Sequence, residues 1–211
     1  MGGAEPIDDV EKGEREQEAQ QVARENPPGA DHGLQVRKAI QSRISGAEIS
    51  NVEIQNVLDR EQPVVESYHV RIPGYAQRIG RRLFFEPGYF QHGRAPMLTA
   101  STRIHPIYFH YPWTEDDIVV IDLPQGFTLD NADQPPHEAA ADTTIKHEMH
   151  IGVTEDGRTL RYLRRLSFGI DEKIFFPPSE YPLLKSVLDT LGERDAHKIA
   201  IREMMLEGEK R

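Results

Sequence analysis

The chain has 211 residues, of which 37% are hydrophobic and 28% are charged, a composition typical of one ordinary domain with an additional tail. Its formal net charge of −10 argues against a nucleic-acid partner, because nucleic-acid-binding proteins need a basic face to neutralise phosphates. The absence of cysteine excludes disulfides, thiolate zinc sites and thiol nucleophiles. No uncharged apolar run approaches the ~20 residues that a membrane-spanning helix needs, so we expect no membrane span.

The first residues of the chain carry most of its acidity. Residues 1–33 contain nine acidic and three basic side chains, a net charge of −6, which leaves −4 for the other 178 residues. The segment has almost no large apolar side chains and ends in NPPGADHG. We expect residues 1–33 to form an acidic linker, disordered or loosely helical, before a domain over 34–206 and a tail over 207–211. Residues 1–6 lack the basic and apolar regions of a signal peptide.

Beyond this linker the apolar residues recur mainly with the period of two that is typical of strands. A short helix over residues 34–44 comes first and is closed by Gly46. Two alternating segments follow, AEISNVEIQNVLD at 47–59 and PVVESYHVRIPGY at 63–75. They predict two half-buried strands.

The clearest pair of strands lies at residues 143–153 and 160–170. The residues predicted to face the core are Ile145, Met149, Ile151 and Val153 in the first strand, and Leu160, Tyr162, Leu166, Phe168 and Ile170 in the second. The TEDGRT segment between them is a hairpin signal, because Gly157 can adopt the positive φ of a tight turn.

The chain ends in a predicted helix and a predicted strand. The helix begins near Ser179 and stops before Gly192. Its apolar residues at helical spacing are Leu184, Val187, Leu188 and Leu191. HKIAIRE at 197–203 returns to alternation and predicts a last edge strand. The fold class expected is therefore mainly β, an antiparallel β-sandwich, immunoglobulin-like or related, with one short N-terminal helix and one C-terminal helix.

The segment RIHPIYFHYPWTEDDIVVIDLP at 103–124 is the first candidate site, because it holds two histidines, the only tryptophan and three consecutive acids. If residues 107–112 form a strand, His105 and His110 point to opposite faces, since their spacing of five is odd. The two histidines therefore cannot ligate one ion from the same strand.

The WTEDD sequence that follows is predicted to be a turn. Asp116 and Asp117 suit a turn because aspartate side chains cap turn backbone groups, and Trp113 suits a cover for the end of the core. The alternative is a binding site in which Trp113, Tyr111 and Tyr89 stack on a glycan or a peptide. These three residues are the candidate binding residues.

HEMH at 147–150 has the spacing of a helical metal pair, but it lies in a predicted strand, which sends His147 and His150 to opposite faces. Nothing in the sequence assembles a nucleophile with its base. We therefore expect no catalytic residue, no metal site and no cofactor.

Arginines gather in two groups, Arg78, Arg81 and Arg82, and then Arg161, Arg164 and Arg165. Arg161 and Arg165 fall on the polar face of their predicted strand, whereas Arg164 interrupts the apolar face. We expect solvated arginines paired with the acids of the chain. The alternative is binding of an anion or of the acidic surface of a partner.

Three long stretches, in this order, resemble a known domain. They are PVVESYHVRIPGYAQRIGRRLFFEPGYF, STRIHPIYFHYPWTEDDIVVIDLPQGFTLDNADQP and LRYLRRLSFGIDEKIFFPPSEYPLLKSVLDTLGERDAHKIAIR. The first contains the pattern G-x-x-L-x-F-x-P, the second a P-I-x-F-x-Y segment followed by I-x-L-P-x-G-F, and the third a Y-P-x-L-K helix. Over about residues 36–203 the chain resembles the C-terminal domain of unknown function that follows the transglutaminase-like core in multidomain bacterial proteins.

That resemblance implies a non-catalytic accessory β-sandwich that packs on or positions a transglutaminase-like catalytic domain, in cis or in trans. It also implies a periplasmic or secreted location. The Cys, His and Asp of the family's catalytic core have no counterpart in this cysteine-free sequence, so no catalytic residue is carried over. The alternative function is a glycan- or peptide-binding module at a cell envelope. The ligand and the oligomeric state stay open.

Overall fold

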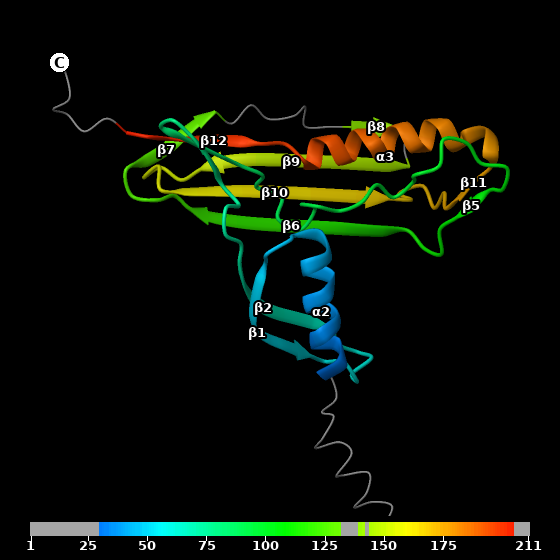
Figure 1. Cartoon of the computed structure of the whole chain (residues 1–211). Coiled ribbons are helices and arrows are strands. Elements are labelled where there is room, and N and C mark those ends of the chain that lie inside the picture. Colours follow the sequence, from blue (N-terminus) through cyan, green and yellow to red (C-terminus); the bar gives the residue numbers. More distant parts are fainter. Residues whose placement is uncertain (1–29, 132–138, 142–143, 205–211) are drawn as a thin grey trace, which may run out of the picture. The chain divides into compact units, whose positions relative to one another are not determined.

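The computed structural model describes residues 30–131, 139–141 and 144–204. They belong to two compact units, the first ending at Pro73 and the second beginning at Gly74 (Figure 1). The predicted domain over 34–206 therefore spans a division in the chain. The predicted tail and all but the last residues of the predicted linker lie outside the described residues.

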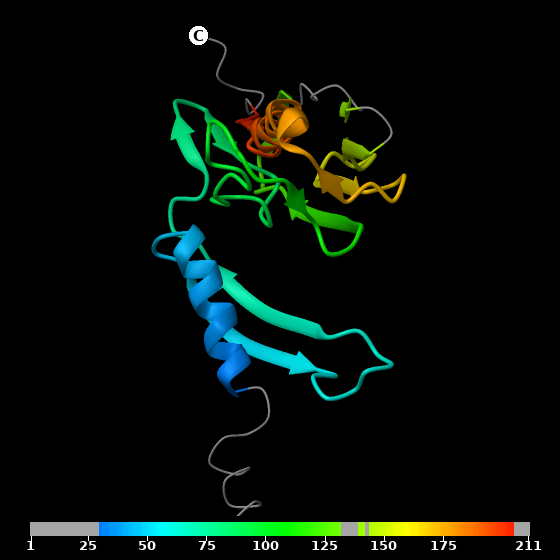
Figure 2. The ribbon, with the colours of Figure 1, turned by 90° about the vertical axis from the view of Figure 1, so that its right-hand side faces the viewer.

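The first unit is a helix and a hairpin. It comprises α2 (Ala30–Arg43), β1 (Glu48–Gln55) and β2 (Val65–Arg71), and the two strands pair antiparallel. The helix lies along the hairpin (Figure 2). Its buried apolar residues are Val36 and Ile40, followed by Ile44 and Ala47 beyond its end. The predicted helix and strands of this part are confirmed, and the helix begins four residues before Leu34.

The second unit contains two four-stranded antiparallel sheets, a two-stranded sheet and one helix. The first sheet has the order β6-β10-β9-β8, the second the order β3-β4-β12-β7, and β11 pairs with β5. The bounds are β3 (Gln77–Ile79), β4 (Arg82–Phe85), β5 (Ile107–Tyr108), β6 (Trp113–Asp122), β7 (Phe127–Asn131), β8 (Ala139–Ala141), β9 (Ile145–Val153), β10 (Thr159–Phe168), β11 (Phe175–Phe176), α3 (Tyr181–Asp195) and β12 (Ile199–Glu203). A 3-10 turn, Pro178–Glu180, precedes α3.

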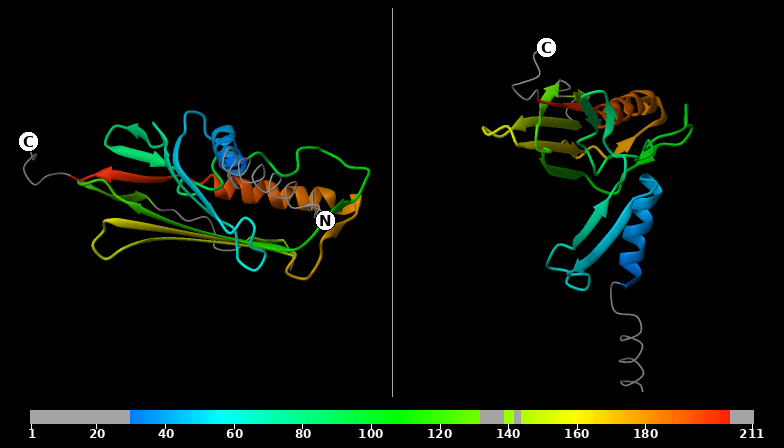
Figure 3. Two further views of the ribbon diagram at one scale, coloured as in Figure 1. Left: turned by 90° about the horizontal axis from the view of Figure 1, so that it is seen from below. Right: turned by 60° about the vertical axis from the view of Figure 1, so that its left-hand side comes forward.

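The β6-β10-β9-β8 sheet, called the long sheet from here on, forms one layer of this unit. The other elements form the second layer. Helix α3 and β12 follow one another along the same face of the β9–β10 pair (Figure 3). One half of that face packs against α3 and the other half against β12 and β4. The predicted fold class is confirmed: the chain is mainly β, with antiparallel sheets in a sandwich-like arrangement and a helix towards each end.

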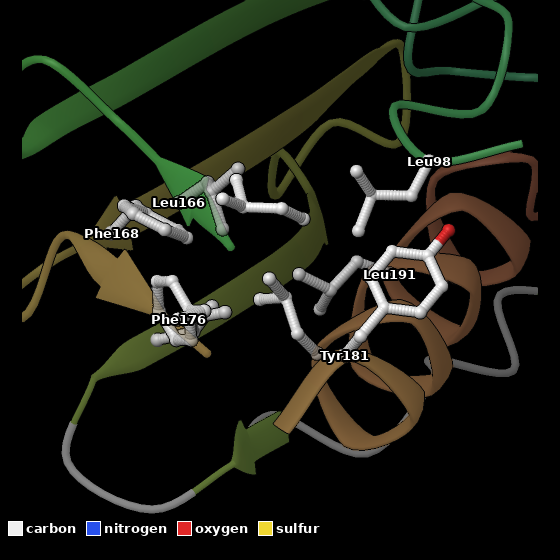
Figure 4. Packing of buried hydrophobic residues seen from close by; sticks show 9 residues of the cluster. Leu98, Leu166, Phe168, Phe176, Tyr181 and Leu191 are labelled. Carbon is white, nitrogen blue, oxygen red and sulfur yellow. The ribbon is translucent and has the colours of Figure 1, made fainter. Parts of the chain in front are cut away.

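Strand β10 contributes to both halves of the core, because its apolar residues alternate over its whole length. Leu166 and Phe168 pack with Tyr181 and Leu191 of α3 in one cluster (Figure 4). The N-terminal half of the strand packs in the second cluster, which consists of Phe85, Met149, Ile151, Leu160, Tyr162, Ile199 and Ile201. The core-facing residues predicted for the hairpin are confirmed, except that Val153 and Ile170 are exposed.

Three local predictions are wrong. WTEDD is not a turn but the first half of β6, which pairs with β10 without a register shift. Helix α3 continues through Gly192 to Asp195. The strand formed from HKIAIRE is central in its sheet, between β4 and β7, and not at an edge. In each case contacts with distant segments override a local preference for a turn, a helix end or an edge.

Replacing Phe168 with alanine tests the core. The ring is 2% exposed, stacks on Trp113 with 4.1 Å between centroids and lies 4.6 Å from the ring of Phe109. We expect Phe168→Ala to lower the free energy of unfolding by about 3–5 kcal/mol in urea titrations, because it leaves a cavity among packed rings. Phe175→Ala removes a half-exposed ring and should cost much less. Equal losses in the two variants would contradict the packing described.

Candidate functional site

The centre of the sandwich holds a buried arginine. Arg164 lies in the middle of β10, between the two apolar clusters, and its side chain is 2% exposed. Its guanidinium binds the carboxylate of Asp195 with both arms: Nε donates to Oδ1 at 2.7 Å and Nη2 donates to Oδ2 at 2.8 Å. This two-point pairing matches the planar fork of arginine to the planar carboxylate.

Two further carboxylates complete the arginine's partners. Nη1 of Arg164 donates to Glu115 Oε2 and to Asp117 Oδ2, each at 3.0 Å. Both acids come from the inward-facing side of β6, where Asp117 stands directly opposite Arg164 in the strand register. Gln91 Nε2 donates to the same oxygen of Asp117, Oδ2, at 2.7 Å. Of the two aspartates predicted to occupy a turn, Asp117 therefore binds a buried cation, whereas Asp116 binds the exposed Arg165.

His147 joins the cluster from β9. It is 1% exposed, and its Nε2 lies 3.0 Å from Asp195 Oδ1. Asp195 is the last residue of α3, so one carboxylate connects the end of this helix to two neighbouring strands. We call Gln91, Glu115, Asp117, His147, Arg164 and Asp195 the Arg164 cluster.

The contacts between Arg164 and Asp195 keep both of these groups ionised. Burial by itself raises the pKa of Asp195, but hydrogen bonds from His147 and Arg164 outweigh burial and lower this pKa below its usual value. Burial likewise opposes the charge of Arg164, yet the paired carboxylates raise its pKa above the usual range. Burial and the nearby Asp195 raise the pKa of Tyr162, so its hydroxyl stays protonated.

A close backbone approach seals the Arg164 cluster. A Cβ atom at Gly88 would lie 3.2 Å from the Tyr162 hydroxyl and 3.2 Å from the carbonyl oxygen of Asp195. Both distances are tighter than ordinary contacts, so only a glycine lets the loop lie this close. Gln91, which follows in the same loop, is 8% exposed. Residues 88–91 of the loop therefore lie directly against the Arg164 cluster.

The contacts of the Arg164 cluster join three strands, β6, β9 and β10, to helix α3. A histidine bound to an aspartate resembles a general base with its orienting partner, but His147 is shielded from substrate and no serine, threonine or cysteine belongs to the cluster. Among the residues that the structure describes, no group of three or more His, Asp or Glu side chains is arranged to hold a metal ion.

The three candidate binding residues do different things. Trp113 is half-buried and stacks on Phe168 at an interplanar angle of 17°, so it belongs to the core. Tyr111 is 67% exposed. Tyr89 is half-buried and its ring meets Phe90 edge to face. The structure therefore leaves only Tyr111 of the three fully available to a ligand.

An exposed aromatic pair lies near Tyr111 in the chain. Tyr108 and Phe175 stand opposite one another in the β5–β11 pair and are 58% and 53% exposed. The exposed His110 meets the Tyr108 ring edge to face, with 5.5 Å between centroids. Sequence reasoning missed Phe175 because nothing in the chain order shows that FF at 175–176 pairs with IY at 107–108. We call Tyr108, His110 and Phe175 the aromatic patch.

The predictions for the other polar motifs are mostly confirmed. His147 is buried and His150 exposed, as expected for opposite faces of a strand. Arg78, Arg82 and Arg165 form exposed ion pairs with Glu203, Asp130 and Asp116. The prediction of a solvated arginine is wrong for Arg164. Its place on the apolar face was visible in the sequence, but its carboxylate partners come from β6 and α3.

No helix among the described residues is long and apolar enough to span a bilayer.

Removing the buried guanidinium should be far more damaging than removing its exposed neighbour. We expect Arg164→Ala to lower the free energy of unfolding by about 3–5 kcal/mol, because three carboxylates lose their shared cation. Arg165→Ala is the matched control: Arg165 is the next residue and also binds a carboxylate with both arms, but it is exposed. This variant should unfold at nearly the wild-type urea concentration. Equal effects would show that burial of the pair is unimportant.

Comparisons with known proteins identify the family. No curated protein matches the chain. A crystal structure of a "putative protease" from Parabacteroides distasonis is similar at 18% identity and a TM-score of 0.40, over 50% of this chain and 19% of that one. This likeness is too weak to support an argument. The model of the family described as "Domain of Unknown Function with solved-structure structure (DUF3858)" matches residues 81–201, more than half of the chain. The chain therefore belongs to the DUF3858 family.

Proposed function

We propose that this chain is a non-catalytic accessory domain that packs on, or positions, a transglutaminase-like catalytic domain. The resemblance of its three long stretches to domains that follow such a core supports the choice of partner. The observation that carries the non-catalytic part is the closure of the Arg164 cluster. The part played by the chain is then mechanical, since it offers a rigid body on which another domain rests.

The argument against catalysis rests on accessibility. A catalytic base must reach the proton that it abstracts, within hydrogen-bond distance or through one water. The side chains of His147 and Arg164 are each 2% exposed, and their polar atoms are bound to carboxylates. A buried network in which every nitrogen of the Arg164 guanidinium binds a carboxylate fixes the relative position of α3 and the long sheet. Such rigidity suits a domain that positions a partner.

The aromatic patch is the surface that we assign to the partner. Exposed aromatic side chains are enriched where proteins bind one another, because they bury much area at a small entropic cost. Phe175 and Tyr108 are neighbours across two strands, so they offer one surface rather than two isolated rings.

The accessory role predicts binding without turnover. The purified chain should show no amide hydrolysis and no glutamine–lysine crosslinking, and reproducible turnover would overturn the proposal. It should bind a transglutaminase-like catalytic domain taken from a protein in which a DUF3858 domain follows that core. In calorimetric titrations, Phe175→Ala should weaken the affinity about tenfold or more. Phe90→Ala, which removes a partly exposed ring in another loop, should leave the affinity unchanged. Absence of any binding would also count against the proposal.

A glycan-binding module is the second candidate, and the same aromatic patch favours it. Aromatic rings that project into solvent can stack on sugar rings, and His110 and Tyr111 supply polar groups beside them. We expect such a module to retain the chain on a glycan array or on purified cell-wall polymer, and Tyr108→Ala and Phe175→Ala to abolish retention. Retention that survives both substitutions would exclude the patch as a glycan site. Trp113→Ala is unsuitable for this test because Trp113 supports the core.

A further inference from the structure

Strand β6 is a long strand at the edge of its sheet, and its outer edge is unpaired among the described strands. It spans ten residues at one end of the sheet order β6-β10-β9-β8 and pairs with β10 over its whole length. Among the described strands, none pairs with its other edge. Natural proteins protect such edges with lysine, proline, a bulge, a very short strand or inward-pointing charges. The inward-pointing acids of β6, Glu115 and Asp117, are bound by Arg164. Residues 113–122 contain no lysine or proline, and their register has no bulge.

Three of the four acids of β6 bind arginines of its own sheet, and the fourth, Asp122, accepts a hydrogen bond from the Thr159 hydroxyl. Glu115 and Asp117 face inward and bind Arg164. Asp116 faces outward and binds Arg165 through both arms, at 2.5 and 3.0 Å. Residues 118–121 of the strand are all apolar, and Asp122 ends it. On the outer face Ile118 is 68% exposed and Val120 is 54% exposed.

We propose that a second copy of this chain pairs antiparallel with β6, so that two long sheets join into one, with Ile118 opposite its own counterpart. Glu115, Asp116 and Asp117 already bind arginines of the same sheet, so a partner of β6 does not have to be basic. Ile118 and Val120 are exposed and apolar, so a partner should offer apolar contact. A second copy supplies that contact, because a two-fold axis at Ile118 brings the two apolar halves together. Leu163, which pairs with Ile118 across β10 and is 41% exposed, extends the apolar strip on each side.

Charge and the length of the paired stretch together select this register. A two-fold axis perpendicular to the sheet keeps outward-facing residues opposite outward-facing ones, so the axis must pass through a residue of β6. An axis at Asp116 or Asp117 places that carboxylate against itself, which is destabilising. An axis at Val119 places Asp116 opposite Asp122. The axes at Ile118 and at Val120 avoid every such pair, but the axis at Ile118 pairs the longer stretch of β6, residues 114–122 rather than 118–122. The register proposed has its axis at Ile118. Its opposed pairs are Thr114 with Asp122, Glu115 with Ile121, Asp116 with Val120, and Asp117 with Val119.

The oligomeric state of the full chain tests the surface. Analytical ultracentrifugation should show a concentration-dependent dimer. Ile118→Lys should weaken the dimer at least tenfold, because two ammonium groups meet at the axis. Ile79→Lys is the matched control, since Ile79 is 65% exposed on β3, in the other sheet. A wild-type chain that stays monomeric at hundreds of micromolar would overturn the proposal, and so would a dimer that Ile118→Lys leaves intact.

Single cysteines test the register, because the chain contains no other cysteine. In Ile118→Cys the two Cα atoms would lie about 4.5–5.5 Å apart, within the range that a disulfide spans. In Val120→Cys the two cysteines would be offset by four residues, about 13 Å, which is too far. Under mild oxidation we expect Ile118→Cys to form a covalent dimer at least tenfold faster than Val120→Cys. Equal rates, or faster crosslinking of Val120→Cys, would overturn the register.

Discussion

The pairing of Arg164 with Asp195 is the interaction on which the rest of the second unit depends. It lies where the two apolar clusters meet, so neither cluster can shift along β10 without separating the guanidinium from its carboxylate. Removing a charge from water is costly, and only a geometry with every arm of the arginine bound offsets that cost. The arrangement therefore specifies one position for α3 on the long sheet.

The Arg164 cluster also decides what the surface can do. By binding Glu115 and Asp117, Arg164 turns two carboxylates of the edge strand towards the interior of the sandwich. On the outer face of β6, Ile118 and Val120 are exposed to solvent. On β6 the carboxylates of Glu115 and Asp117 thus face inward, while the apolar side chains of Ile118 and Val120 face outward.

How much of this could be predicted from the sequence depends on the range of the interactions. The alternation in β9 and β10 is a local signal, because successive side chains of a strand point to opposite faces. The same rule placed His147 and His150 on opposite faces and Arg164 on the apolar face. The prediction of a turn at WTEDD was wrong because consecutive acids favour a turn locally. In this fold they lie in a strand, where Arg164 and Arg165 of β10 bind them.

The aromatic residues show the same contrast. The only tryptophan was expected either to cover the core or to bind a ligand, and in the structure it packs against the core and stacks on Phe168. The exposed pair of Tyr108 and Phe175 was not predicted, because each strand is two residues long and they are far apart in the chain. Short strands carry too little periodicity to reveal their partners.

The sequence by itself determined the fold class, the core faces of the central hairpin and the resemblance to a domain family, because these depend on periodicity and residue order. Only the tertiary structure decided which charges meet. Asp195 lies 31 residues from Arg164 and Asp117 lies 47 residues away, so no local pattern links them. The physical reason is burial: once α3 and β6 enclose Arg164, its charge must be paired where it stands.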